Sequence, residues 1–235
     1  MGKRGSTAKF MADAWVFPGG RVDDTDRARA ADLVAGCNDP EQLPWIVTAL
    51  RETVEELGIW LTEPPRSEPL GDRDVFAELD AAGQAFAAEV RYFANWITPA
   101  DLPIRYDARF YATVVDGDLD PIPDMAEIDR AEWVRPSDAI LAAARREWLI
   151  PFPTHVTLES LARVGSAQEF MERAAELDID TIQPRIRIEE DGSLRVVMPG
   201  EEGFDDLPEA TGDLQKLAQA ARKAKGTRNT IAEIE

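Results

Sequence analysis

The length, composition and charge of the chain exclude several classes of protein. The chain has 235 residues, 44% of them hydrophobic and 30% charged, which is enough for one hydrophobic core and argues against a fully disordered chain. There are 26 Lys and Arg against 45 Asp and Glu, so the formal net charge is −19, and nucleic acid or an anionic membrane would be repelled. An anionic small molecule must therefore be bound through local cations or a metal ion.

Cysteine usage and hydropathy indicate the compartment. Cys37 is the single cysteine, so the chain can form neither an internal disulfide nor a Cys-rich zinc site. No apolar run reaches the roughly 18 residues of a transmembrane helix, and the basic residues 1–6 are not followed by the apolar stretch of a signal peptide. We expect a cytoplasmic protein without membrane or nucleic-acid partners. The sequence leaves the oligomeric state open, with a homodimer as one option.

In the first third of the chain, a glycine-containing turn and a long helix are predicted. Residues 14–20 favour a short strand that Pro18 ends before Gly19 and Gly20. The polar segment that follows looks inserted and contains a possible helix over 27–35. A helix over 44–57 is predicted because apolar residues recur three and four apart, with Pro44 at its start and Gly58 after its end.

The remaining elements follow from the same rules. Prolines make 62–69 a linker, and Asp191-Gly192 is a strong hairpin turn. Helices are predicted over 74–93, 138–148, 158–164 and 166–177, strands over 105–115 and 130–134, and a hairpin over 182–197. From Gly200 we expect a poorly ordered tail with one amphipathic helix over 214–224.

The informative string is Arg51-Glu52-Thr-Val-Glu55-Glu56-Leu-Gly-Ile on the predicted helix over 44–57. Spacings of three and four residues place the three glutamates on one helix face, where their like charges repel. Oxygen ligands without His or Cys suit Mg²⁺ or Mn²⁺, which complete their coordination with water and phosphate oxygens. The alternative is an acidic helix face that is simply solvated.

Gly19-Gly20 followed by this string resembles the Nudix box, Gly-x5-Glu-x7-Arg-Glu-U-x-Glu-Glu-x-Gly-U, where U is a bulky aliphatic residue. Phe17-Pro18 before the glycines is also similar to the family. Three departures are present: Asp26 replaces the first glutamate, 24 residues separate Asp26 from Arg51, and Thr53 takes an aliphatic position. An interrupted box of this kind resembles the branch of peroxisomal-type coenzyme A diphosphatases and their bacterial relatives.

The resemblance implies an α/β (α+β) Nudix fold, a mixed sheet sandwiched between helices. The Nudix domain would span 1–180 with an insertion at 27–43, followed by a C-terminal hairpin at 181–200 and a poorly ordered, acidic and lysine-containing tail at 201–235. Only about a dozen residues precede Trp15, and residues 1–4 resemble the end of a strand hairpin in the family. The sequence leaves open whether Met1 is the true start; if it is, one or more N-terminal strands of the family fold would be missing.

The resemblance also implies roles for individual residues. Mg²⁺ or Mn²⁺ would be bound by Glu52, Glu55, Glu56 and the Gly19 carbonyl. Arg51 would orient the carboxylates, and Asp26 would lie next to these groups without touching the metal. A further acid, as base or additional ligand, would come from Glu127, with Asp129 or Glu132 as substitutes. In the predicted strand over 105–115, Arg105 and Arg109 share a face and would contact substrate phosphates, the alternative being surface arginines. We assign no role to His155 or Cys37.

The implied reaction is hydrolysis of the pyrophosphate in a nucleoside diphosphate derivative by metal-activated water. Coenzyme A or acyl-coenzyme A leads by resemblance, and ADP-ribose, other nucleotide sugars or dinucleotides are alternatives. A reading of another class is a catalytically impaired nucleotide-binding or interaction protein that keeps the Nudix fold.

Overall fold

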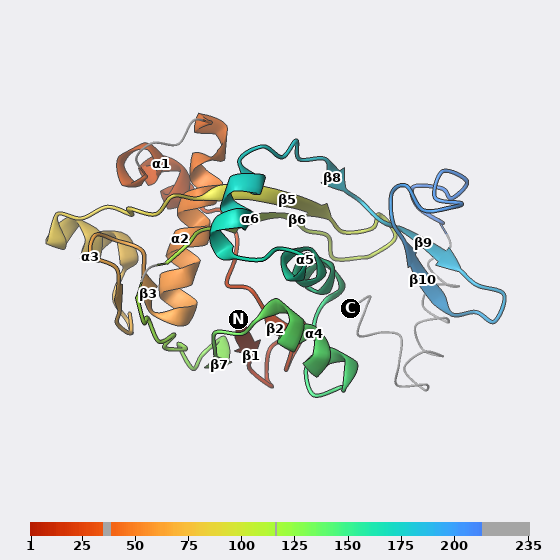
Figure 1. The fold of residues 1–235 in the computed structure, drawn as a ribbon, viewed down its shortest axis with the longest axis horizontal. Helices are drawn as coiled ribbons and strands as arrows, with labels where there is room; N and C mark the ends of the chain where they lie inside the picture. Colours follow the sequence, from red (N-terminus) through yellow and green to blue (C-terminus); the bar gives the residue numbers. More distant parts are fainter. Residues whose placement is uncertain (35–38, 116, 213–235) are drawn as a thin grey trace.

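The computed structural model describes residues 1–34, 39–115 and 117–212 (Figure 1). Cys37 and the predicted helix over 214–224 lie outside these residues. The helices are α1 (Asp24–Leu33), α2 (Leu43–Leu57), α3 (Val75–Ala82), α4 (Pro136–Ala144), α5 (Phe152–Ala162) and α6 (Ala167–Ala174), and a 3₁₀ turn, η1, spans Pro40–Gln42. The strands are β1 (Gly2–Arg4), β2 (Trp15–Val16), β3 (Ile59–Trp60), β4 (Arg66–Ser67), β5 (Arg91–Ile97), β6 (Asp107–Ala112), β7 (Ile128–Ala131), β8 (Thr181–Ile182), β9 (Arg185–Ile188) and β10 (Leu194–Val197).

The expected mixed α/β architecture is confirmed, but the described strands form several small sheets rather than one. In one of them β5 lies between an antiparallel β6 and a parallel β8. In another, β1 lies between β2 and β7, both antiparallel to it. In Figure 1, α1, α2 and α3 gather at one side of the molecule and the β9–β10 hairpin lies at the other. No helix in these described ranges is long and apolar enough to span a membrane.

Helix α2 is the centre of the main hydrophobic core. The predicted apolar stripe is buried, with Val47 and Val54 fully inaccessible to solvent. The helix ends at Gly58, whose φ of +63° is a left-handed conformation that glycine adopts without strain. A Cβ at this position would also lie 3.0 Å from the Glu68 carbonyl oxygen. The local sequence therefore fixes both the buried face and the end of the helix.

The segment predicted as an insertion packs against α2 through α1. Asp23 caps α1, because its carboxylate accepts a hydrogen bond from the Asp26 N–H. The Asp26 carboxylate in turn accepts from the Asp23 N–H, so that both side chains satisfy backbone donors. Ala30 and Leu33 of α1 enter the main core. The helix starts earlier than the expected residue 27, and Asp26 therefore lies on a rigid element instead of in a loop.

Some predicted boundaries were wrong. The helix predicted over 74–93 ends at Gly83, which has a φ of +62°, and Arg91–Ile97 form β5 instead. The strand predicted over 105–115 is shorter, so Arg105 lies outside β6. The apolar spacing continues past Gly83, but pairing with β6 decides the conformation of the later residues.

The C-terminal part of the described chain is a hairpin followed by turns. β9 and β10 pair around Asp191-Gly192 as predicted. Residues 200–212, in the segment predicted to be poorly ordered, are fastened at two points. Arg185 Nη1 donates to the carbonyls of Phe204 and Leu207, and the Thr211 N–H donates to Asp101 Oδ1 over 2.6 Å.

Candidate active site

Asp26 and Arg51 form a buried ion pair that joins α1 to α2. Asp26 is fully buried, and Arg51 donates to it from Nε over 2.9 Å and from Nη2 over 3.0 Å. Thr48, one turn before Arg51, donates its hydroxyl to the same carboxylate over 2.7 Å. Burial by itself would raise the pKa of Asp26, but the hydrogen bonds from Arg51, the Asp23 N–H and Thr48 outweigh it and lower that pKa.

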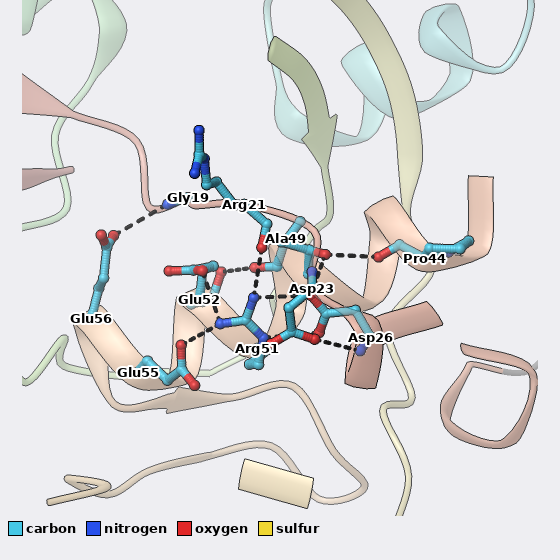
Figure 2. Close-up of polar contacts among 12 residues, drawn as sticks. Gly19, Arg21, Asp23, Asp26, Pro44, Ala49, Arg51, Glu52, Glu55 and Glu56 are labelled. Atoms are coloured by element: carbon cyan, nitrogen blue, oxygen red, sulfur yellow. Dashed lines mark hydrogen bonds and ion pairs between the residues drawn. The ribbon is translucent and has the colours of Figure 1, made fainter. Parts of the chain in front are cut away.

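The same arginine holds two of the predicted ligands. Arg51 Nη1 donates to Glu52 Oε1 over 2.8 Å and to Glu55 Oε2 over 2.5 Å. Its Nη2 also donates to the Arg21 carbonyl, which fastens the glycine loop to the helix. Figure 2 shows Arg51 at the centre of these contacts, with Glu52 and Glu55 reaching it from α2. Arg51 therefore contacts both carboxylates through one guanidinium nitrogen, and the orienting role that the family resemblance implies stays a prediction.

The glycine loop passes close to the acidic face of α2. A Cβ on Gly20 would lie 2.1 Å from Glu52 Oε1, so any larger residue at this position would displace the Glu52 carboxylate from its present place. The Gly19 N–H donates to Glu56 Oε2 over 3.2 Å (Figure 2). It is thus the amide of Gly19 that contacts an acid of the helix. The role predicted for its carbonyl stays a prediction.

The glutamates hold negative charge that the described residues only partly compensate. Glu56 is 4% exposed, and burial, followed by the charge of Glu52, raises its pKa to about 8. Burial also raises the pKa of Glu52 and of Glu55, although the positive charge of Arg51 opposes this. No described Lys or Arg lies within ion-pair distance of Glu56. A cation beside Glu56 would relieve this unfavourable charge.

Among the acids predicted downstream, Glu127 is the one that acts on the helix. Its charge raises the pKa values of Glu52 and Glu56, so it lies within electrostatic reach of both. Its side chain is 65% exposed. Its loop is tied to α2 because the Asp124 N–H donates to the Glu56 carbonyl, and Asp124 in turn accepts from the Glu127 N–H. The fold thus brings Glu127 to the acidic face.

The donor chemistry of this face suits a hard divalent cation. It offers carboxylate oxygens, no sulfur or imidazole among the described residues, and at Glu56 a carboxyl group whose charged form the surrounding protein does not stabilise. The carboxylates do not form a closed ligand set: within the parts of the chain that the structure covers, no three His, Cys, Asp or Glu residues are grouped as a metal site. Glu52 and Glu55 bond to Arg51 instead. Each gives Arg51 one carboxylate oxygen, Oε1 of Glu52 and Oε2 of Glu55.

The two predicted substrate arginines lie apart from each other and make other contacts. Arg105 is exposed in the turn before β6, and its Nε donates to the Thr98 carbonyl. Their expected common strand face is therefore wrong. Arg109, on β6, stacks 4.2 Å above the Trp45 ring and donates to Gln42. Trp45 lies about 10 Å along the helix axis from Glu52, at 1.5 Å per residue.

Sequence reasoning missed two residues of this region. Thr48 was not recognised, although its spacing of three residues before Arg51 places it on the same helix face. Arg4 on β1 lies beside Glu127, with Nη2 4.0 Å from Oε2. No local pattern marks Arg4, because its neighbours come from β7, from the loop before it and from the segment before β2.

The comparisons with known proteins point to one family. No family profile matches the chain. It is 30% identical over 177 residues to "Putative nudix hydrolase 7" of Caenorhabditis elegans, covering 69% of this chain and 55% of that protein. It is 24% identical over 196 residues to human acyl-coenzyme A diphosphatase NUDT19, covering 69% of this chain and 51% of that protein. The chain thus spans about half the length of these curated relatives.

A solved structure carries the likeness to the fold. The crystal structure of a Nudix hydrolase from Alicyclobacillus acidocaldarius matches with a TM-score of 0.62 and 27% sequence identity, over 73% of this chain and 86% of that chain. Three findings therefore agree: this solved structure, the two curated relatives, and a glycine loop that contacts the face of α2 bearing Arg51 and the glutamates. The chain belongs to the Nudix hydrolase family.

Proposed function

We propose that the protein hydrolyses the pyrophosphate of a nucleoside diphosphate derivative with Mg²⁺ or Mn²⁺, with coenzyme A or acyl-coenzyme A as the leading substrate. The observation that supports this most is Glu56, a buried carboxylate beside a glycine loop, with acidic neighbours and no ion-pair partner among the described residues. A divalent cation compensates the charge of such a carboxylate and can bind phosphate oxygens of a substrate at the same time.

Each residue of the face has a part in this proposal. Glu52, Glu55, Glu56 and the Gly19 carbonyl supply oxygens for the cation, and Arg51 keeps the carboxylates oriented. When bound, the cation neutralises diphosphate charge and acidifies a nearby water. Glu127, exposed and within reach of Glu52 and Glu56, accepts the proton of the attacking water. Asp26 holds Arg51 from behind.

The proposed substrate follows from similarity. One relative is by name an acyl-coenzyme A diphosphatase, and the interrupted box of this chain resembles the coenzyme A diphosphatase branch. ADP-ribose, other nucleotide sugars and dinucleotides are the alternatives. A catalytically impaired nucleotide-binding protein would be favoured if Asp26 failed to replace glutamate. Asp26 nevertheless reaches Arg51 with both oxygens, which supports the enzyme.

The direct test is a mass-spectrometric product screen. Purified protein with Mg²⁺ or Mn²⁺ is offered coenzyme A, acyl-coenzyme A, ADP-ribose, NADH and dinucleoside polyphosphates. We expect phosphorylated products from at least one compound, and a loss of about 10³-fold, or about 4 kcal/mol of barrier, in Glu55→Gln and Glu56→Gln. Glu159→Gln, on the exposed side of α5, is the matched control and keeps full activity.

Two outcomes contradict the proposal in different ways. Absence of products with either metal contradicts the enzymatic activity and favours the nucleotide-binding alternative. Near-normal turnover by both Glu55→Gln and Glu56→Gln contradicts the location of the site on α2.

A further inference from the structure

We propose that Arg4 binds the diphosphate group of the substrate through its guanidinium, a role that neither the box nor its surrounding motif assigns. This inference rests on the proposed function and names a positively charged side chain that acts beside the metal ion at the acidic site. A diphosphate approaching Glu52, Glu56 and Glu127 meets negative charge, and a metal ion compensates only part of it. A protein cation with free donors must lie on the same side.

The fold places Arg4 at the edge of the acidic face. Arg4 ends β1, the central strand of its sheet, and pairs with Ile128 of β7 at a point where the register of the ladder shifts. The next residue, Gly5, donates its N–H to the Glu127 carbonyl over 2.9 Å. The backbone of β1 is therefore fixed beside the proposed proton acceptor, and Arg4 is held on a strand rather than on a loop.

The donors of Arg4 are largely unused. Its Nε is buried and makes no hydrogen bond to any residue that the structure describes. Its Nη2 is 4.0 Å from Glu127 Oε2, which is within ion-pair reach but too long for a hydrogen bond. Its side chain is 23% exposed, so a ligand can approach. A buried donor without an acceptor is unfavourable, so the guanidinium is not held by the protein itself, and its exposed end can bind a phosphate oxygen.

Two other arginines of this region are already engaged. Arg51 directs its guanidinium to Asp26, Glu52, Glu55 and the Arg21 carbonyl. Arg109 stacks on Trp45 and bonds to Gln42. Arg4, in contrast, leaves its Nε without an acceptor among the described residues and has the Glu127 carboxylate only at 4.0 Å. The planar fork of arginine matches phosphate oxygens with two parallel hydrogen bonds.

The test measures binding as well as turnover. The probe is α,β-methylene-ADP, a diphosphate analogue that is not hydrolysed at its bridge, titrated calorimetrically with Mn²⁺ present. We expect Arg4→Gln to raise its Kd by about 10- to 100-fold and to lower kcat/KM by a similar factor, the value of charge-assisted hydrogen bonds. Arg4→Lys keeps the positive charge but not the planar fork, so its Kd for the probe should lie between that of the wild type and that of Arg4→Gln.

Lys3→Gln is the matched control. Lys3 is the preceding residue of β1, and its Nζ pairs with Asp13 over 2.6 Å instead of with the acids of the site. Its Kd and kcat/KM should equal those of the wild type. If Arg4→Gln does not fold, as judged by circular dichroism, Arg4→Lys decides: a wild-type Kd in that variant overturns the proposal.

The remaining outcomes separate this inference from the proposed function. Wild-type protein that neither binds the probe nor hydrolyses any compound of the screen overturns both. A wild type that does both, with an Arg4→Gln variant of unchanged Kd, overturns only the role of Arg4. An unchanged Kd together with a lower kcat assigns Arg4 to positioning Glu127 and also overturns diphosphate binding.

Discussion

Two buried carboxylates at the acidic face of α2, Asp26 of α1 and Glu56 of α2, have surroundings of opposite effect on their charge. Asp26, at the Arg51 end, is inaccessible to solvent and receives hydrogen bonds from two side chains and one backbone N–H. Glu56, at the other end, is almost equally buried but receives one backbone N–H bond and faces acidic neighbours. The pKa of Asp26 is therefore lowered, whereas the pKa of Glu56 is raised to about 8.

This comparison separates scaffold from site. Equal burial produces opposite charge preferences because only Asp26 is supplied with enough donors to replace water. The Asp26 end thus fixes the geometry of α1, α2 and the glycine loop. The Glu56 end lacks the donors that would stabilise its carboxylate, so the protein alone favours the protonated form, and a bound cation would favour the charged form.

The largest expected effect is the loss of stability when the scaffold pair is broken. Asp26→Ala leaves Arg51 buried without its main partner and should lower the free energy of unfolding by about 3–5 kcal/mol. Urea denaturation measures this. Asp24→Ala, an exposed acid in the same helical turn, should cost less than about 1 kcal/mol. Similar losses in the two variants would contradict the scaffold role.

A smaller effect is expected from adding a cation to the other end. Mn²⁺ at about 100 times its Kd should stabilise the protein by about 2.7 kcal/mol, because the ion binds only the folded state. Thermal denaturation with and without Mn²⁺ measures this. The shift should disappear in Glu56→Gln and persist in Glu159→Gln. A shift of the same size in Glu56→Gln would place the cation elsewhere.

The smallest effect tests the contact between loop and helix. Gly20→Ala would place a Cβ where Glu52 Oε1 lies, and the flexible carboxylate would move aside at little cost in stability. Turnover should nevertheless fall about tenfold, or about 1.4 kcal/mol, because the displaced group is a proposed ligand. At Gly19 a Cβ meets open space, so Gly19→Ala should lose less activity. Equal losses in kcat would show that the approach of Gly20 is not what matters.

Helix α2 and its acids were predictable because their pattern is local. The apolar period and the punctuation by Pro44 and Gly58 predicted the helix almost to its ends. The spacing of the glutamates then placed them on one face. The helix predicted over 74–93 failed for the opposite reason. Its apolar spacing continued after Gly83, but pairing with β6 made Arg91–Ile97 a strand.

The sequence by itself thus determined the acid-bearing helix, the glycine turn before it and the family resemblance, since these depend on neighbours within a few residues. Only the tertiary structure decided which charges are compensated. Arg51 meets Asp26 across two helices, Glu127 arrives from the loop before β7, and Arg4 arrives from β1. The charge state of a buried group depends on the donors and charges packed around it, and segments distant in sequence supply these only when the chain folds.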